Sequence, residues 1–66
     1  MHEYIFSILD INISERKLIN RLVNRLRGDF IATETKDGAA YSVTFDSQNN
    51  ADEFKIEANK IIPNLL

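Results

Sequence analysis

The sequence predicts an α+β fold, a two-layer sandwich with elements in the order β-α-β-β-α. An apolar stretch rich in β-branched and aromatic residues opens the chain, and an Asp-Gly turn signal separates two alternating runs near its middle. Two stretches with helically spaced apolar residues complete the pattern. A right-handed crossover then predicts a single three-stranded sheet, antiparallel or mixed, with both helices on one face. Residues 1–66 are expected to form one domain, since so short a chain can form only one core.

The stretch EYIFSILDI, residues 3–11, is too short and too uniformly apolar for a surface helix, and we interpret it as the first strand. Its side chains alternate between two largely apolar faces. These faces hold Tyr4, Phe6 and Ile8 on one side and Ile5, Leu9 and Ile11 on the other. One face fits the core, and we assign Tyr4, Phe6 and Ile8 to the face that needs another cover. The strand also has no proline or lysine to protect its edge from pairing.

The first helix is expected between Asn12 and Gly28. Asn12 and Ser14 could each be its N-cap. Asn12 is the better candidate, because Glu15 three residues later completes a capping box and because a cap at Ser14 would put Arg16 and Lys17 in the first turn. Gly28 is placed to end the helix as a left-handed C-cap residue. The apolar stripe of this helix consists of Leu18, Ile19, Leu22, Val23 and Leu26.

A β-hairpin is predicted around Asp37 and Gly38, which form the favoured dipeptide of a two-residue turn. The register counted back from this turn pairs Lys36 with Ala39, Glu34 with Tyr41, Ala32 with Val43, and Phe30 with Phe45. One face of the hairpin would then be apolar and belong to the core, with Phe30, Ala32, Tyr41, Val43 and Phe45. The opposite face would be small and uncharged, with Ile31, Thr33, Thr35, Ala40, Ser42 and Thr44.

The second helix is expected to begin at a capping box of Asn50 and Glu53 and to end before Pro63. Its apolar stripe consists of Ala51, Phe54, Ala58, Ile61 and Ile62, whereas Ile56 falls outside the stripe and is expected to be exposed. This order of elements resembles a ferredoxin-like split βαβ arrangement that lacks its last strand. The resemblance implies that the first strand lies beside the third, in a sheet of order 1-3-2.

Charge is divided unevenly along a chain whose net charge is -2. Residues 1–28 carry five Arg and Lys against three acids, and residues 29–66 carry three Lys against seven acids. The first helix sets most of these cations opposite its apolar stripe, which is typical of a solvated outer face and also suits a site for an acidic partner. The residues of this basic helix face are Arg16, Lys17, Arg21, Asn24, Arg25 and Arg27.

The sequence contains no constellation typical of an enzyme, a cofactor site or a metal site. It has one histidine, no cysteine and no glycine-rich phosphate loop. No apolar run is long enough for a membrane span and the N-terminal stretch lacks the features of a signal peptide, so a cytoplasmic location is expected. A domain of this size without disulfides or metals commonly gains stability by oligomerisation.

The favoured hypothesis is therefore a small protein-interaction module of the regulator or inhibitor type, without catalytic activity. It would bind another protein through the basic helix face and form a homodimer through its sheet, with Tyr4, Phe6 and Ile8 at the dimer face. The alternative is a nucleic-acid-binding domain that uses the same basic helix, although the pI near 5.2 is unusual for that class.

Overall fold

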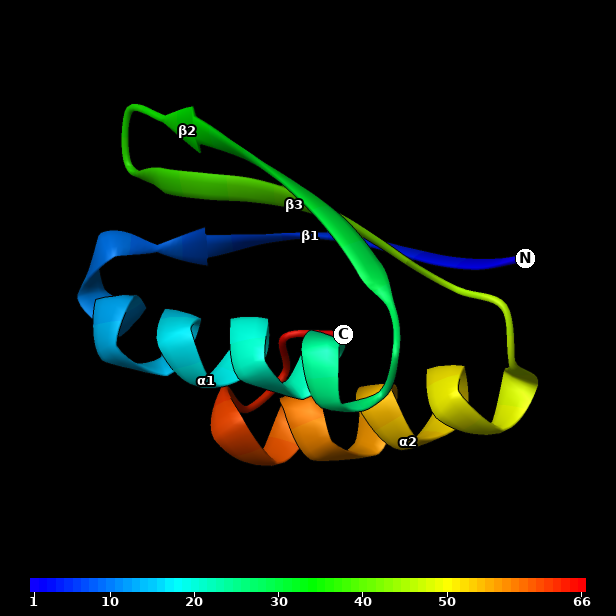
Figure 1. The fold of residues 1–66 in the computed structure, drawn as a ribbon. Coiled ribbons are helices and arrows are strands. Elements are labelled where there is room, and N and C mark those ends of the chain that lie inside the picture. The colour runs from blue at the N-terminus through cyan, green and yellow to red at the C-terminus, as the bar shows by residue number, and fades with distance from the viewer.

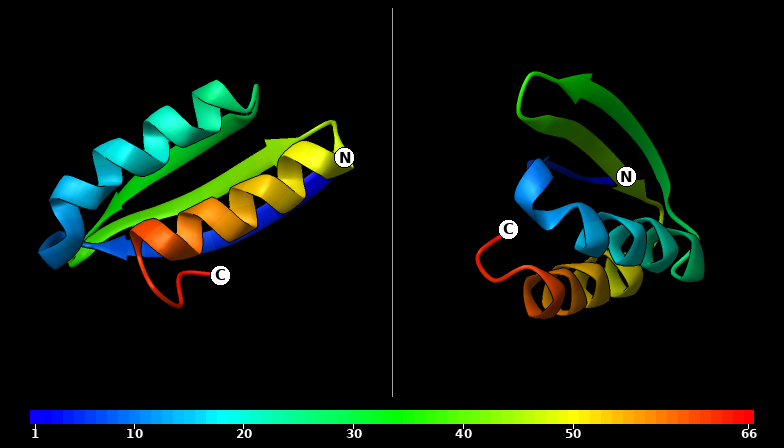
Figure 2. Two further views of the ribbon diagram at one scale, coloured as in Figure 1. Left: turned by 90° about the horizontal axis from the view of Figure 1, so that it is seen from below. Right: turned by 90° about the vertical axis from the view of Figure 1, so that its left-hand side faces the viewer.

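The computed structural model describes residues 1–66 and shows the predicted α+β architecture (Figure 1). All strand pairings are antiparallel, in the order β1-β3-β2. Both helices lie side by side on one face of the sheet, as the views in Figure 2 show. The elements are β1 (His2–Leu9), a short 3₁₀ turn η1 (Asp10–Asn12), α1 (Ile13–Arg25), β2 (Asp29–Thr35), β3 (Gly38–Phe45) and α2 (Gln48–Ile61). The predicted fold class and strand order are confirmed.

The hydrophobic core fills the space between the sheet and the two helices. Phe54 of α2 lies at its centre, with its ring centroid 5.1 Å from that of Phe45 and 6.1 Å from that of Phe6. The predicted stripes of both helices face this core, except that Leu18 and Ile61 lie at its margin. Ile56 is exposed, as expected.

The predicted face assignment of the first strand is wrong. Phe6 and Ile8 lie in the core with 7% and 2% of their surface exposed, and the partly buried Tyr4 donates a hydrogen bond to the carbonyl of Ala51 at 3.2 Å. Because Phe6 lies directly opposite the buried Tyr41 of β3, the two side chains share the inner face of the sheet. The uncovered face of β1 therefore carries Ile5 and Leu9. The strand also ends at Leu9, which places Ile11 in η1.

The turn of the hairpin lies one residue earlier than predicted, at Lys36 and Asp37, with Thr35 opposite Gly38. Phe30 consequently pairs with Val43. This shift of two residues keeps every side chain on its predicted face.

Gly38 is required by a close approach of two strands. It has no positive φ, so the turn does not need it for a left-handed conformation. A Cβ atom at Gly38 would instead overlap the carbonyl oxygen of Ile8 and lie 2.8 Å from the Cα atom of Leu9. The absence of a side chain here lets β1 pair with β3 along its whole length.

At the end of α1, Gly28 is not the left-handed C-cap residue that was predicted. Arg27 adopts the left-handed conformation, with φ of 59°, and Gly28 does not. The Gly28 N–H donates to the carbonyl of Val23 at 2.9 Å and the Arg27 N–H donates to that of Asn24 at 3.1 Å, which is a Schellman motif. Gly28 is needed because a Cβ atom there would overlap the ring of Phe45.

The two helix starts agree only in part with the predicted caps. Asn12 is the N-cap residue of α1, but its side chain makes no capping hydrogen bond. The predicted cap at Asn50 is wrong, because α2 begins at Gln48 and the Ser47 hydroxyl accepts a hydrogen bond from the Asn50 N–H at 3.3 Å. The same helix ends at Ile61, before Pro63, as predicted.

Replacing Gly38 tests the close approach of β1 and β3. Gly38→Ala is expected to lower the free energy of unfolding by about 1–3 kcal/mol, because the added methyl group meets backbone atoms that cannot move aside. Thr35→Ala, at the exposed residue opposite Gly38, is the matched control and should change stability by about 0.5 kcal/mol or less. Urea unfolding followed by circular dichroism measures both, and equal effects of the two substitutions would contradict the close approach.

Candidate functional site

The structure separates the six residues of the predicted basic helix face into different roles. Arg16 is bound to other residues of the same chain. Its Nε donates to the Tyr41 hydroxyl at 3.0 Å, and its Nη2 lies 2.9 Å from Oε1 of Glu34. Its guanidinium also lies over the Tyr41 ring, 5.7 Å from the centroid. The hydrogen bonds to Glu34 and, second, to Tyr41 raise the pKa of Arg16 above its ordinary value, so the side chain stays charged. Arg16 thus joins α1 to β2 and β3, which makes it a structural residue.

The remaining cations of α1 are open to solvent. Arg25 donates to Oε2 of Glu53 on α2 at 3.3 Å, but both side chains are at least half exposed, and such pairs contribute little to stability. Lys17 and Arg21 make no hydrogen bond or ion pair through their side chains, and neither do Asn24 and Arg27. Because Lys17, Arg21 and Arg25 are spaced by four residues, they form one row along α1.

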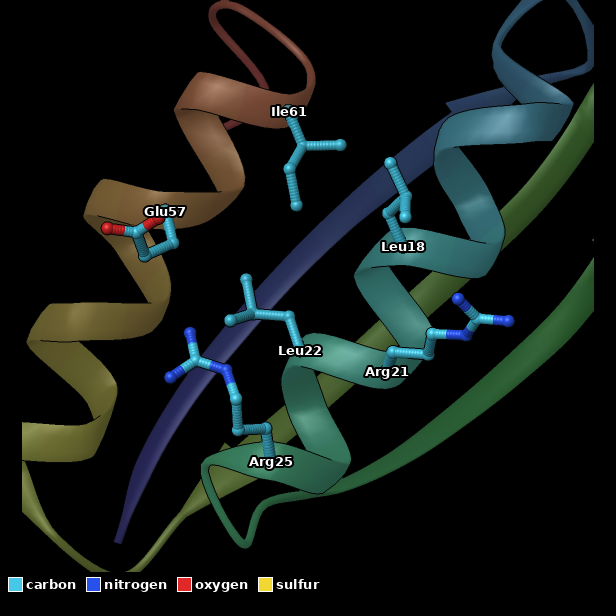
Figure 3. Close-up of a pocket in the computed structure, with 6 residues that line it drawn as sticks. All are labelled: Leu18, Arg21, Leu22, Arg25, Glu57 and Ile61. Carbon is cyan, nitrogen blue, oxygen red and sulfur yellow. The ribbon is translucent and has the colours of Figure 1, made fainter.

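A groove of about 310 Å³ runs between α1 and α2 beside this row. Leu18, Leu22 and Ile61 point into it from both helices, and Leu18 is 46% exposed (Figure 3). Arg25 reaches from α1 toward α2, whereas the stem of Arg21 lines the groove and its guanidinium extends away from α2. Glu57 completes the lining on the α2 side. We call this set of six residues the helix groove.

The helix groove could not be located from the sequence. Leu18 and Ile61 both belong to predicted core stripes, and nothing in their spacing shows that the two helices leave these side chains partly uncovered where they meet. The only available signal was their position at the margin of each stripe, next to cations on α1 and acids on α2.

The face of the sheet opposite the helices is uncovered, and the strand register arranges its side chains in four rows across β1, β3 and β2. The predicted small-residue face of the hairpin is confirmed, and β1 adds two larger apolar side chains to it. Ile5 and Ile31, on the two outer strands, are 74% and 72% exposed. In order along the sheet, the rows are Glu3–Thr44–Asp29, Ile5–Ser42–Ile31, Ser7–Ala40–Thr33 and Leu9–Gly38–Thr35. We call this surface the open sheet face.

The side chains of the helix groove and of the open sheet face can make charged and apolar contacts. No three His, Cys, Asp or Glu side chains gather in a group that could hold a metal ion. Neither helix combines the length and the apolar character that crossing a membrane requires.

Comparison with protein-family models, curated proteins and solved structures gives no match. The resemblance to a ferredoxin-like arrangement therefore stays a prediction.

Removing the Tyr41 hydroxyl tests the structural role of Arg16. Tyr41→Phe loses the hydrogen bond from Arg16 and the 2.7 Å bond to Asn20, and should lower the free energy of unfolding by about 1–3 kcal/mol at roughly 0.5–1.5 kcal/mol per bond. Tyr4→Phe is the matched control, because it loses one longer bond and should cost about half as much. Thermal or urea unfolding measures the difference. A Tyr41→Phe protein as stable as the wild type would contradict a bridging role for this hydroxyl.

Proposed function

We propose that the protein is a small non-enzymatic interaction module, of the regulator or inhibitor type, that binds an acidic amphipathic helix of another protein in the helix groove. The observation that carries the proposal is the groove itself, where an apolar floor meets a row of cations that is largely free of internal partners.

The shape and lining of the groove favour a peptide over a small molecule. Small-molecule sites enclose most of their ligand, whereas this groove is shallow and lined by only six residues. Leu18 on one rim and Ile61 on the other instead provide the apolar contact, with the buried Leu22 at the floor between them. An amphipathic helix whose apolar residues recur every three or four positions matches such a lining.

The charge of α1 favours an acidic partner. This helix carries four cations against one acid, and Lys17 and Arg21 are unpaired beside the groove. Arg25 could exchange the carboxylate of Glu53 for one from a partner at little cost, because an exposed ion pair is weak. Carboxylates flanking the apolar stripe of the bound helix would then meet cations on the α1 side.

Nucleic acid would meet the same cations, except that Arg16 is bound to Glu34 and Tyr41. Lys17, Arg21 and Arg27 are unpaired, and Arg25 is held only by its exposed ion pair with Glu53. A nucleic-acid complex would weaken steeply as salt rises, whereas apolar contacts in the groove would persist. Salt dependence therefore separates the two ligands.

A random library of helical peptides displayed on phage tests the proposed ligand. Selection against the protein should enrich acidic peptides with apolar residues three or four positions apart, and Arg21→Glu should weaken their binding at least tenfold in fluorescence anisotropy. Lys55→Glu makes the same charge change at an exposed site on the other side of α2 and should leave binding unchanged.

Three outcomes would contradict this function. The selection could yield no binding peptide, it could enrich basic peptides, or the selected peptides could bind the Arg21→Glu and wild-type proteins equally well. Tight and strongly salt-dependent binding of a single-stranded oligonucleotide, lost on Arg21→Glu, would favour the nucleic-acid alternative.

A further inference from the structure

We infer that the open sheet face is the interface with a second copy of this chain, with the two sheets packed face to face about a two-fold axis that crosses the strands above Tyr41. This inference concerns the layer opposite the helix groove and does not depend on the proposed function.

In the two central rows of the open sheet face, the distribution of side-chain size is complementary to itself, whereas the outer rows place Glu3 over Leu9 at the rim. The row Ile5–Ser42–Ile31 has large side chains at both ends, and its neighbour Ser7–Ala40–Thr33 consists of small ones. A two-fold axis between these rows, perpendicular to the strands, places each large row on the small row of the other copy. Ile5 then lies over Ser7 of the second copy, and Ile31 lies over Thr33. Large side chains would thus meet small ones across the interface, as close packing between sheets requires.

Charge disfavours the other two-fold orientation. Glu3 and Asp29 form one end of the open sheet face, and its other end carries Lys36 and Asp37 in the turn, with Asp10 beside them. The proposed axis reverses the strands, so it brings Asp29 of one copy near Lys36 of the other. An axis parallel to the strands would instead stack Glu3 and Asp29 of both copies together, and like charges would repel.

The position of the apolar side chains favours the face over the free edge of β1. Ile5 lies on β1 and Ile31 lies on β2, the two outer strands of the sheet. Pairing β1 with β1 of a second copy would leave Ile31 in water. A face-to-face contact covers both residues.

The size of the surface sets the expected strength of the dimer. Eight residues at ~3.3 Å and three strands at ~4.8 Å span roughly 26 × 14 Å, about half the ~800 Å² that a standard interface buries on each partner. The contact is therefore smaller than a standard interface, and a weak dimer that forms at high protein concentration is expected. Face-to-face packing also leaves both helix layers on the outside, so that both grooves stay accessible.

Sedimentation equilibrium over a wide concentration range tests the interface. The wild type should dimerise, and Ile31→Lys should raise the dissociation constant at least tenfold. Ile56→Lys is the matched control, because Ile56 is an exposed isoleucine on the helix layer, and it should leave the dimer unchanged. A wild type that stays monomeric at all concentrations would overturn the inference.

A charge exchange tests the orientation of the axis. Asp29→Lys and Lys36→Glu should each weaken the dimer severalfold, because each places like charges near one another across the interface. The double variant should restore the wild-type dissociation constant. Failure of the double variant to recover would contradict the reversed orientation.

A single introduced cysteine distinguishes the face from the edge, since the chain has none of its own. Thr33→Cys lies close to its symmetry mate in the face-to-face dimer and should cross-link with a short bismaleimide. In a dimer joined at β1, the two β2 strands would be five strand spacings, or about 24 Å, apart and should not cross-link. A dimer that resists both this cross-linking and Ile31→Lys would be an edge dimer and would overturn the inference. Arg21→Glu should leave the dimer intact, so failure of the groove proposal would be recognised separately.

Discussion

The contacts of Tyr41, at the centre of β3, orient the rest of the structure. Its ring stacks on Phe6 of β1 and Phe30 of β2, with centroids 5.3 and 5.7 Å away. Its hydroxyl donates to Asn20 and accepts from Arg16, both on α1. One side chain thus ties the two outer strands and the first helix to the middle of the sheet. Because the strands alternate, placing Phe6 and Phe30 inside also places Ile5 and Ile31 outside.

A three-stranded sheet with two helices can bury only one of its faces. In a chain of 66 residues, the buried surface is a modest fraction, ~60% of what the unfolded chain exposes, and stability is correspondingly limited. Apolar side chains left on the second face are then available for association, and their burial contributes about 1.5–3 kcal/mol each when complete. The exposed isoleucines are therefore a consequence of the small size of the domain, which has no second layer to cover them.

The cations of α1 differ in their surroundings, because one is bound within the chain and others are exposed without a partner. Arg16 lies where α1 passes over the end of the hairpin, so it meets Tyr41 and Glu34 and is used internally. Lys17 and Arg21 point to solvent beside the helix groove and are free. The groove and the open sheet face lie on opposite layers, so the two proposed contacts would not compete for the same surface. In the proposed dimer, two linked grooves would also raise the apparent affinity for a partner that presents two helices.

The elements, their order and the faces of the hairpin could be predicted from the amino-acid pattern alone. Periodicity carries this information, because the apolar residues of β3 alternate with small ones and those of α2 recur at helical spacing. The observed register of the hairpin differs from the predicted one by two residues, which leaves these faces unchanged. The wrong position of the turn therefore did not alter the predicted fold.

Which face of β1 is buried depends on tertiary contacts, because both faces of the strand are apolar and periodicity does not distinguish them. The same holds for Gly28 and Gly38, whose local sequence suggests turn conformations but whose lack of a side chain serves contacts with Phe45 and Ile8 far along the chain. The partner of Arg16 and the helix groove also depend on segments that are distant in sequence. The local sequence pattern indicates the helix or strand to which a residue belongs and the side on which it lies. Its burial and its bonding partners depend on the segments that pack against it in the folded chain.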